Sequence, residues 1–227
     1  QQTYDWLEDD LSRRTMLAYL NLKISGNVRY NFDVMTSGQY FCECTSDFRG
    51  GTFIDCGACY GETVESFITW SKGNYKKIYA IEADPTNAEI CRQYLALHDC
   101  EDVETVNCAV WHQQGMISFS DDAGTSSKIG EDGIVRVRAD TIDHILQGAP
   151  VDFLKMDIEG AELNALRGAA ESIRAYHPLL AICVYHKSED LITIPQYLKE
   201  LWDYRFFLRK HHIADELELV LYGIPRN

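Results

Sequence analysis

The sequence predicts an α/β fold with a central, mostly parallel sheet of seven strands and helices on both of its faces. From residue 50 onward, short apolar segments alternate with segments of helical periodicity, which is typical of βαβ units around a parallel sheet. The last two apolar segments follow one another without a helix between them, so we expect a final antiparallel pair at the sheet edge. A helical stretch before residue 50 predicts an N-terminal helical extension.

Length and composition fit one large globular core. The chain has 227 residues, 46% of them hydrophobic, which is enough to bury a single core without further support. We therefore expect one domain over residues 51–227 and a helical cap over residues 1–50, which is too short to bury a core alone. No apolar run approaches the roughly 20 residues that cross a bilayer, so no membrane partner is expected.

The formal net charge of −14 argues against one class of partner. A polyanion such as a nucleic acid would be repelled over most of the surface. Basic residues gather at 205–212, where they alternate with aromatic and aliphatic ones. We interpret this segment as a strand with a solvated face rather than as a binding patch for nucleic acid.

Cysteine usage predicts the redox setting. Of the eight cysteines, Cys56, Cys91, Cys108 and Cys183 lie in apolar segments, where a reduced thiol behaves as a small hydrophobe. The first ten residues carry four acidic side chains instead of the basic and apolar stretches of a signal peptide. We therefore expect a reducing, cytoplasmic location. Cys42-Glu43-Cys44 and the pair at 56–59 together have the thiols of a zinc site, although the second pair falls in a glycine-containing turn after an apolar segment.

The elements follow in order along the chain. Residues 4–24 have helical periodicity, and Ser25-Gly26-Asn27 supplies a stop. Five parallel strands are expected at Thr52–Cys56, Lys77–Glu82, 103–110, 151–157 and 179–185. The helices between them are expected at 62–70, Pro85–Leu97, 161–174 and 194–202. An antiparallel hairpin is expected from Gly115–Ser120 and 134–138, and the final antiparallel pair from 205–209 and 216–221.

A glycine-containing turn follows the first strand. Gly57 and Gly61 stand between the strand and the next helix, where a missing Cβ permits unusual φ/ψ and close packing against a ligand. The spacing Gly-x-x-x-Gly departs from the Gly-x-Gly-x-x-Gly of dinucleotide-binding proteins, which weakens a pyrophosphate assignment. Asp55 precedes the first glycine, where its carboxylate could orient the loop or meet the amino group of a methionine moiety.

An acidic residue ends the second expected strand, at the spacing typical of a residue that binds a ribose. Glu82 lies 25 residues after Gly57, and a carboxylate there can accept from both ribose hydroxyls. Strand, glycines, helix, strand and acid in this order predict S-adenosylmethionine as the cofactor. Ligands in open α/β sheets bind beyond the carboxyl ends of the strands, so the adenine is expected near Asn107, Cys108 and Ala109.

The segment from Lys155 to Glu162 gathers charges at one strand-to-helix corner. Asp157 and Glu159 fall on the same side if the strand continues, since side chains alternate with period two. Glu162 follows in the first helical turn. Carboxylates this close repel unless something positive lies among them, and Lys155, the cofactor sulfonium or a divalent cation would serve.

His186 ends the fifth apolar segment and is expected to open onto the carboxyl side of the sheet. An imidazole can accept a proton near neutral pH, so His186 is a candidate base for a hydroxyl acceptor that loses its proton during methyl transfer. In an alternative, Asp157, Glu159 and His186 together hold Mg²⁺ or Mn²⁺ to bind an acceptor diol. The expected catalytic residues are His186, Asp157 and Glu159, without a metal in the favoured version.

Several segments together resemble the FkbM family of methyltransferases. They are residues 53–63, 80–87, 107–110, 139–143 and 153–162, and the strand ending in Tyr185-His186. The most specific of them is Lys155-Met156-Asp157-Ile158-Glu159-Gly160-Ala161-Glu162. The resemblance implies a Rossmann-like class I methyltransferase fold and O-methylation, commonly of sugar or polyketide-type hydroxyls.

The resemblance also implies that Asp55, Gly57 and Glu82 contact the cofactor and that Asp157, Glu159 and His186 border the transfer site. The complete set of expected cofactor-binding residues is Asp55, Gly57, Ala58, Gly61, Glu82, Ala83, Asn107, Cys108, Ala109 and Asp157. A small-molecule or glycan acceptor is expected to enter over residues 121–133. Two alternatives stay open: an oxidoreductase that binds a nicotinamide cofactor, and a binding module that keeps the fold without chemistry.

Overall fold

β1 (Thr52–Cys56) lies in the middle of four parallel strands in the computed structural model. β2 (Lys77–Glu82) pairs with one edge of β1 and β8 (Phe153–Met156) with the other, while β3 (Val103–Asn107) pairs with β2. All five β1 side chains are buried, because helices cover both faces of these strands. Residues 48–178, which contain the four strands, form one of two compact units.

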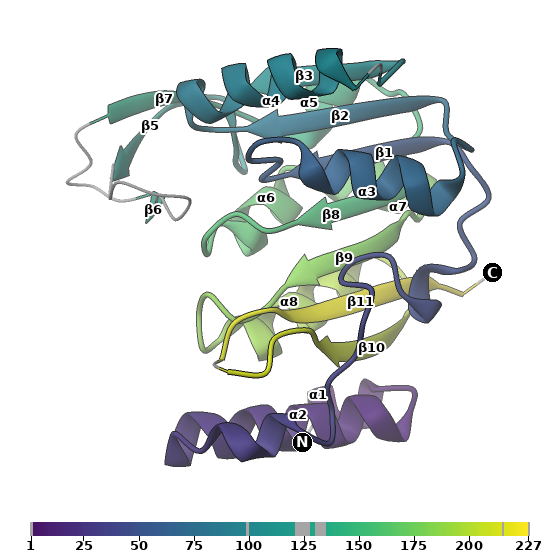
Figure 1. Ribbon diagram of the computed structural model, residues 1–227, viewed down its shortest axis with the longest axis vertical. Helices are drawn as coiled ribbons and strands as arrows, with labels where there is room; N and C mark the ends of the chain where they lie inside the picture. The colour runs from purple at the N-terminus through teal and green to yellow at the C-terminus, as the bar shows by residue number, and fades with distance from the viewer. Residues whose placement is uncertain (1, 99, 121–127, 130–134, 215, 227) are drawn as a thin grey trace. The chain divides into compact units, whose positions relative to one another are not determined.

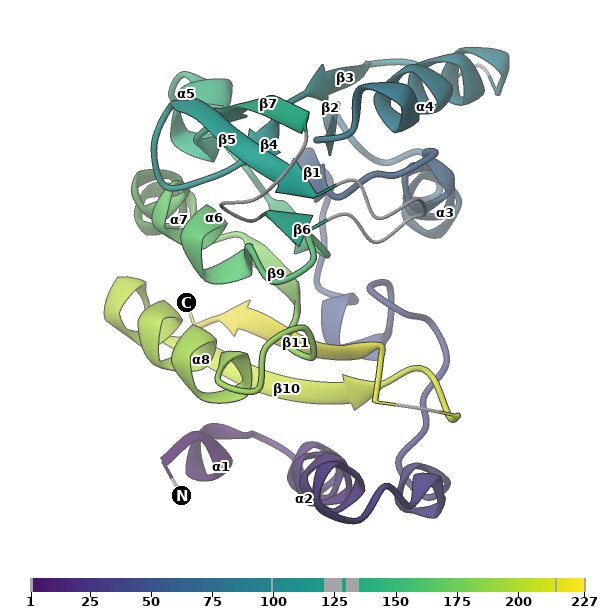
Figure 2. The ribbon, with the colours of Figure 1, turned by 90° about the vertical axis from the view of Figure 1, so that its left-hand side faces the viewer.

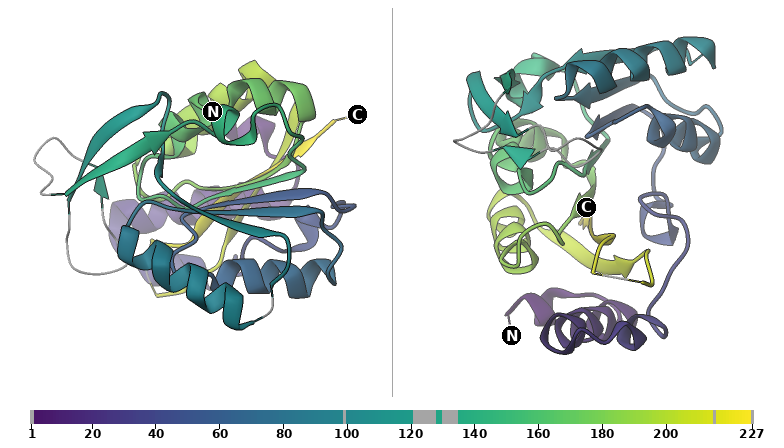
Figure 3. Two further views of the ribbon diagram at one scale, coloured as in Figure 1. Left: turned by 90° about the horizontal axis from the view of Figure 1, so that it is seen from above. Right: turned by 60° about the vertical axis from the view of Figure 1, so that its left-hand side comes forward.

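Helices flank the four strands on both sides. α3 (Glu62–Ser71) and α4 (Pro85–Leu97) cover one face, and α5 (Ile142–Leu146), α6 (Glu162–Arg167) and α7 (Ala170–Tyr176) cover the other (Figures 1 and 2). The view from above shows the same layers (Figure 3, left). The helices lie along the faces of the strands, so loops lie at the carboxyl end of each parallel strand.

The residues at the start of α4 determine where this helix begins. Asp84 caps the helix, and its Oδ1 accepts the N–H groups of Thr86 and Asn87 at 2.8 Å each. Pro85 occupies the first turn, where its missing N–H costs nothing. The predicted bounds of β1, β2 and α4 are all confirmed.

A smaller sheet follows β3 in the same unit, in the order β4-β7-β5-β6. Its strands are β4 (Ala109–Val110), β5 (Gly115–Ser120), β6 (Lys128–Ile129) and β7 (Val135–Asp140). β5 and β7 pair antiparallel, which confirms the predicted hairpin. The single strand predicted over 103–110 is wrong, because the chain changes sheet at Cys108. Figure 1 shows β5 and β7 beyond the carboxyl ends of β2 and β8.

The helix predicted over 161–174 is also wrong as one element. It breaks at Gly168 into α6 and α7. A Cβ at Gly168 would collide with the backbone carbonyl of Trp111, so the break lets two backbones approach. Asp143 of α5 accepts the N–H groups of Glu171 (3.1 Å) and Ser172 (2.8 Å) at the start of α7, which satisfies donors that the helix leaves free.

Residues 1–47 and 179–227 form the second unit. In it β11 (Leu219–Pro225) lies between β9 (Leu179–Cys183) and β10 (Tyr204–Lys210) and is antiparallel to both. α8 (Asp190–Leu201) connects β9 to β10 and begins earlier than the predicted 194, because Leu191 is buried as well. Two 3₁₀ turns, η1 (Val28–Asn31) and η2 (Glu43–Thr45), precede the first strand.

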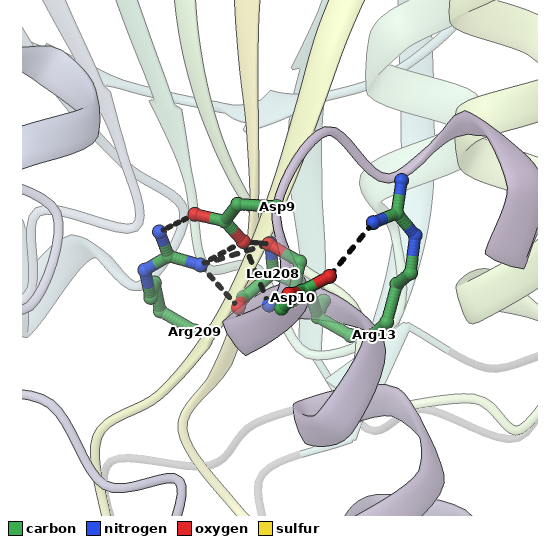
Figure 4. A network of polar contacts seen from close by, with 6 residues as sticks. Asp9, Asp10, Arg13, Leu208 and Arg209 are labelled. Carbon is green, nitrogen blue, oxygen red and sulfur yellow. Dashed lines mark hydrogen bonds and ion pairs between the residues drawn. The ribbon is translucent and has the colours of Figure 1, made fainter.

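The single helix predicted over 4–24 is wrong as well. The chain forms α1 (Gln2–Trp6) and α2 (Asp10–Ser25), interrupted where Leu7 bridges to Phe206 of β10. Asp9 caps α2 through the N–H of Ser12 at 2.8 Å. The same carboxylate binds Arg209 of β10, with Nη2 to Oδ2 at 2.6 Å (Figure 4). α2 therefore begins where Asp9 both caps the helix and forms an ion pair with Arg209.

The structure describes residues 2–98, 100–120, 128–129, 135–214 and 216–226. The seven-stranded sheet has the order β10-β11-β9-β8-β1-β2-β3, which confirms the predicted mixed sheet with a final antiparallel pair. The expected domain boundary at residue 50 stays a prediction. Within the described residues, no helix is long and apolar enough to cross a membrane.

Candidate active site

The loop after β1 packs tightly onto the neighbouring strand ends. Gly57 has a φ of 80°, and its N–H and that of Ala58 both donate to the carbonyl oxygen of Ile81, at 2.9 and 3.1 Å. A Cβ at Gly57 would collide with the backbone carbonyl of Asp157. The first glycine of the loop is therefore required by the contact between two protein backbones, independently of any ligand.

Gly61 is the N-cap residue that precedes α3 and has a φ of 101°. A Cβ there would come within 3.2–3.3 Å of Cys91, Tyr94 and Leu95 on α4. The second glycine therefore lets two helices on the same face of the sheet approach. Between the glycines, Ala58 is buried and Cys59 has a φ of 47°.

Asp55 is fully buried in β1 and faces Lys155 of β8, its partner in the strand register. The Lys155 Nζ lies 2.8 Å from Asp55 Oδ1 and also donates to the carbonyl oxygen of Gly57 at 3.0 Å. Burial raises the pKa of Asp55 against the lowering effect of Lys155, and the charge of Asp157 raises it further. The geometry favours the first of the two roles expected for Asp55, which is to orient the loop.

The second carboxylate oxygen of Asp55 has no hydrogen-bond partner among the described residues. A buried acceptor in this state costs free energy until a donor reaches it. The interior end of the loop can therefore accept a further donor.

Glu82 joins the loop to the end of β2. Its Oε2 accepts the N–H of Cys59 at 3.0 Å and its Oε1 accepts the N–H of Asp84 at 2.8 Å. Burial raises the pKa of Glu82, and the two backbone donors offset part of that effect. Each oxygen keeps a lone pair, because a carboxylate offers about four acceptor positions in all.

The residues expected around the adenine lie next to Glu82. The Asn107 side chain donates to the carbonyl oxygens of Glu82 (2.9 Å) and Ala83 (3.1 Å), and the Cys108 N–H donates to Glu82 O at 3.1 Å. Ala109 packs in a small apolar cluster together with Ala83, Val137 and Ile117. The last two come from β7 and β5 and carried no signal in the sequence, because only the pairing of the smaller sheet brings them here.

The charged corner differs from an extended strand. β8 ends at Met156, and Glu159 adopts a left-handed conformation with a φ of 55°. The alternation expected to place Asp157 and Glu159 on one side therefore does not apply. Glu162 is fully buried at the start of α6 and accepts the N–H of Ile158 at 3.0 Å, so it closes the turn. Lys155, one of the three cations that could lie among these carboxylates, is paired with Asp55.

His186 is half-buried and follows β9 by three residues, in the second compact unit. The strand predicted over 179–185 is therefore shorter at its carboxyl end. Of the acceptor segment expected over 121–133, only Lys128 and Ile129 are among the described residues; the rest lies outside them.

The basic segment of β10 is a strand, as predicted, but two of its cations are not solvated. Arg209 is 9% and Lys210 1% exposed. Arg209 is held by Asp9 and Ser12, and Lys210 donates to the carbonyl oxygen of Leu217. These hydrogen-bond and ion-pair partners stabilise the two buried charges.

The model of the methyltransferase FkbM domain matches residues 55–206, which is more than half of the chain and includes the loop, Glu82 and the charged corner. The chain belongs to this family. An FkbM methyltransferase from Methylobacillus flagellatus KT is 28% identical, with a TM-score of 0.84 over 99% of this chain and 57% of that chain. This protein thus spans little more than half the length of that relative.

Two further solved structures share the fold at 14% identity. An rRNA methylase from Streptococcus thermophilus has a TM-score of 0.50 over 78% of this chain and 87% of its own. A precorrin 8w decarboxylase from Methanobacterium thermoautotrophicum has a TM-score of 0.51 over 85% of this chain and 91% of its own. The fold is that of the Rossmann-like class I methyltransferases. Comparison with curated protein sequences gives no significant match.

Proposed function

We propose that this FkbM-family protein transfers a methyl group from S-adenosylmethionine to a hydroxyl oxygen of a sugar, a glycan or another small hydroxylated acceptor. The observation that carries the proposal is the position of Glu82. It ends the strand next to β1 and receives the N–H of Cys59 from the loop after β1. A carboxylate in this place suits the two hydroxyls of a ribose.

The residues present fit this cofactor. Each Glu82 oxygen accepts one backbone N–H and retains room for a hydroxyl donor. The unpartnered oxygen of Asp55 suits a donor at the loop. Ala83 and Ile117 are partly buried apolar side chains of the cluster beside Glu82, which suits a flat aromatic ring. When bound, S-adenosylmethionine supplies an electrophilic methyl group on its sulfonium.

The remaining roles belong to the chain's own residues. Asp55 and Lys155 hold the loop that presents Ala58 and Gly61, and Asn107 and Cys108 fix the turn that carries Glu82. The acceptor hydroxyl must lose its proton as its oxygen bonds to carbon, and His186 is our candidate for the base. Asp157 and Glu159 are our candidates for orienting the acceptor. Orientation of the two reactants supplies most of the acceleration in such a displacement.

Methyl-labelled cofactor tests the proposal directly. The full chain is incubated with S-adenosylmethionine and a panel of monosaccharides, oligosaccharides and small alcohols, and each labelled product is mapped by mass spectrometry. We expect label on an acceptor oxygen. Label confined to nitrogen or carbon would overturn O-methylation, and a nicotinamide-dependent oxidation without any transfer would establish the oxidoreductase alternative.

The metal alternative has its own experiment. If Asp157, Glu159 and His186 held Mg²⁺ or Mn²⁺ for an acceptor diol, a chelator would abolish transfer and added metal would restore it. Transfer that a chelator leaves unchanged supports the metal-free version.

His186→Ala is expected to leave cofactor binding intact and to slow transfer about a hundredfold or more.

A further inference from the structure

The second compact unit contains a small pocket that the residues proposed for methyl transfer do not line. Its volume of about 280 Å³ is near the lower end of small-molecule sites. The walls come from α1 and the segment after it, from the first turn of α2, from α8 and from the residue after β11, all of which belong to this unit. The lining includes one aromatic and five charged side chains: Asp5, Trp6, Glu8, Arg13, Lys199 and Arg226.

Backbone hydrogen bonds hold the pocket residues in place. Leu7 is buried and bridges to Phe206 of β10, and the Glu8 N–H donates to the carbonyl oxygen of Phe206 at 2.9 Å. The N–H of Arg226 donates to the carbonyl oxygen of Asp203 at 3.0 Å. The side chains of the pocket therefore extend from backbone that the sheet and the end of α8 fix.

Each of the three cations in the lining has an acidic partner. The pairs are Arg226 with Glu8, Lys199 with Asp203 at 2.6 Å, and Arg13 with Asp10 at 3.1 Å (Figure 4). These acids balance the positive charges. A charge-balanced lining favours a neutral ligand over an anion, because an anion would have to displace the acids that are already bound.

The ion pairs leave hydrogen-bonding positions for a ligand. A guanidinium has five N–H donors and a carboxylate has about four acceptor positions. Arg13 donates to Asp10 and to the carbonyl oxygen of Leu7 at 2.6 Å, and Arg226 occupies one oxygen of Glu8. The pocket thus offers both donors and acceptors. This combination suits hydroxyl groups, which donate one hydrogen bond and accept others.

Trp6 adds an apolar surface to this polar lining. It lies at the end of α1 and is partly buried. An indole presents a large flat face for packing, and a pyranose ring has faces of C–H groups with hydroxyls around its edge. An entirely apolar ligand would leave the charged groups without partners at a cost in free energy. The lining therefore fits a sugar better than a hydrocarbon.

We propose that this pocket binds one neutral sugar residue of a glycan. One face of the sugar ring packs on Trp6, and its hydroxyls donate to Glu8 and accept from Arg13 and Arg226. The pocket holds the sugar through these groups alone. The assignment is therefore independent of whether the protein transfers a methyl group to a sugar.

The tryptophans of the chain make sugar binding visible. The full chain contains four of them, so fluorotryptophan labelling gives one fluorine NMR resonance for each, and Trp6→Phe identifies that of Trp6. The labelled chain is titrated with the methyl glycosides of glucose, mannose and galactose. We expect at least one glycoside to shift the Trp6 resonance until it saturates. Trp202 is the matched comparison, since it follows α8 in the same unit and is partly exposed but does not line the pocket.

Three results of the titration would overturn the proposal. The first is a Trp6 resonance that no glycoside shifts. The second is an equal shift of the Trp6 and Trp202 resonances, which would indicate a general effect of the sugar solution. The third is a Trp6 resonance that inorganic phosphate shifts and the glycosides do not, which would make the pocket an anion site.

Arg226→Met tests the polar side of the pocket. The backbone N–H that binds Asp203 is unchanged in this variant, so the end of the chain is expected to stay in place, and its melting temperature checks this. Loss of the guanidinium should raise the Kd of the bound glycoside about tenfold. Arg29→Met is the control, because Arg29 is exposed on η1 and does not line the pocket. Equal Kd values for the two variants would contradict the assignment.

Discussion

Lys155 and Asp55 form an ion pair inside the sheet, with Nζ 2.8 Å from Oδ1 and both side chains at most 2% exposed. The ammonium group also donates to the carbonyl oxygens of Gly57 (3.0 Å) and Cys56 (3.4 Å). The charge pair of β1 and β8 thereby holds the first residues of the loop. Buried charges are tolerated only with partners of this quality.

Replacing Lys155 by Met should destabilise the protein and loosen the loop. An unpaired Asp55 carboxylate would remain in the core, which costs about 3–5 kcal/mol of unfolding free energy. Chemical denaturation measures the loss. The double variant Asp55→Leu/Lys155→Met should lose less than the sum of the two single variants, because it leaves no buried charge.

Lys199→Met is the matched control for this pair. Lys199 binds Asp203 at 2.6 Å on the surface of α8, and an exposed pair of this kind contributes at most about 1 kcal/mol. Equal losses from Lys155→Met and Lys199→Met would contradict a structural role of the buried pair.

Gly57→Ala should unfold or strongly destabilise the protein, whereas Gly26→Ala should cost only about 1–2 kcal/mol. Both glycines have positive φ, 80° and 67°, but only the Gly57 Cβ would collide with a neighbour, the carbonyl oxygen of Asp157. Thermal unfolding of the two variants measures the difference. Similar melting temperatures would mean that the loop can move away from β8 without a loss of stability.

Acid should remove the stability that Asp9 contributes. Burial raises the pKa of Asp9, but hydrogen bonds from Arg209 and Ser12 outweigh it and hold the pKa at about 2, below its ordinary 3.8. A lowered pKa stabilises the fold above the ordinary value, and the contribution disappears as pH falls from about 4 to about 2. Asp9→Asn keeps a good helix cap without the charge. Its unfolding free energy should therefore vary less over this window than that of the unmodified protein.

Cofactor binding should weaken at acidic pH through Glu82. Because burial raises its pKa above the ordinary range, the carboxylate that accepts hydroxyl donors is lost as pH falls through that raised value. Glu82→Gln should raise the Kd for S-adenosylmethionine about tenfold to a hundredfold and flatten this pH dependence. Glu89→Gln, on the exposed side of α4, should leave both unchanged. Calorimetric titration at several pH values measures the Kd of each variant. If the Kd of Glu82→Gln still depended steeply on pH, the pH dependence would belong to another group.

The sequence predicted best those elements whose local signals agree with the fold. β1 and β2 are apolar segments with an acid at or next to their carboxyl ends, and α4 combines a capping Asp84 with Pro85; their predicted bounds are confirmed. The breaks at Asp9 and Gly168 were not predictable, because each depends on a distant partner: Arg209 in one case and the Trp111 carbonyl in the other.

The site shows the same division. The order of strands, glycines and acid predicts a cofactor site at the carboxyl ends of β1, β2 and β3, since strand ends meet at one edge of a parallel sheet. The pairing of Asp55 with Lys155 depends on the register of β1 against β8, which sets two residues 100 positions apart side by side. The left-handed turn at Glu159 has no signal in its residue type, because glutamate seldom adopts a φ of 55°.

The most direct test of the central claim is a thermal-shift titration of the full chain with S-adenosylmethionine, S-adenosylhomocysteine and NAD⁺. A ligand present at a hundred times its Kd stabilises the fold by about 2.7 kcal/mol, which corresponds to roughly 5–10 °C for a chain of this size. We predict that shift with both adenosyl compounds, a smaller shift in Glu82→Gln, and no shift with NAD⁺. A shift with NAD⁺ alone would contradict this prediction.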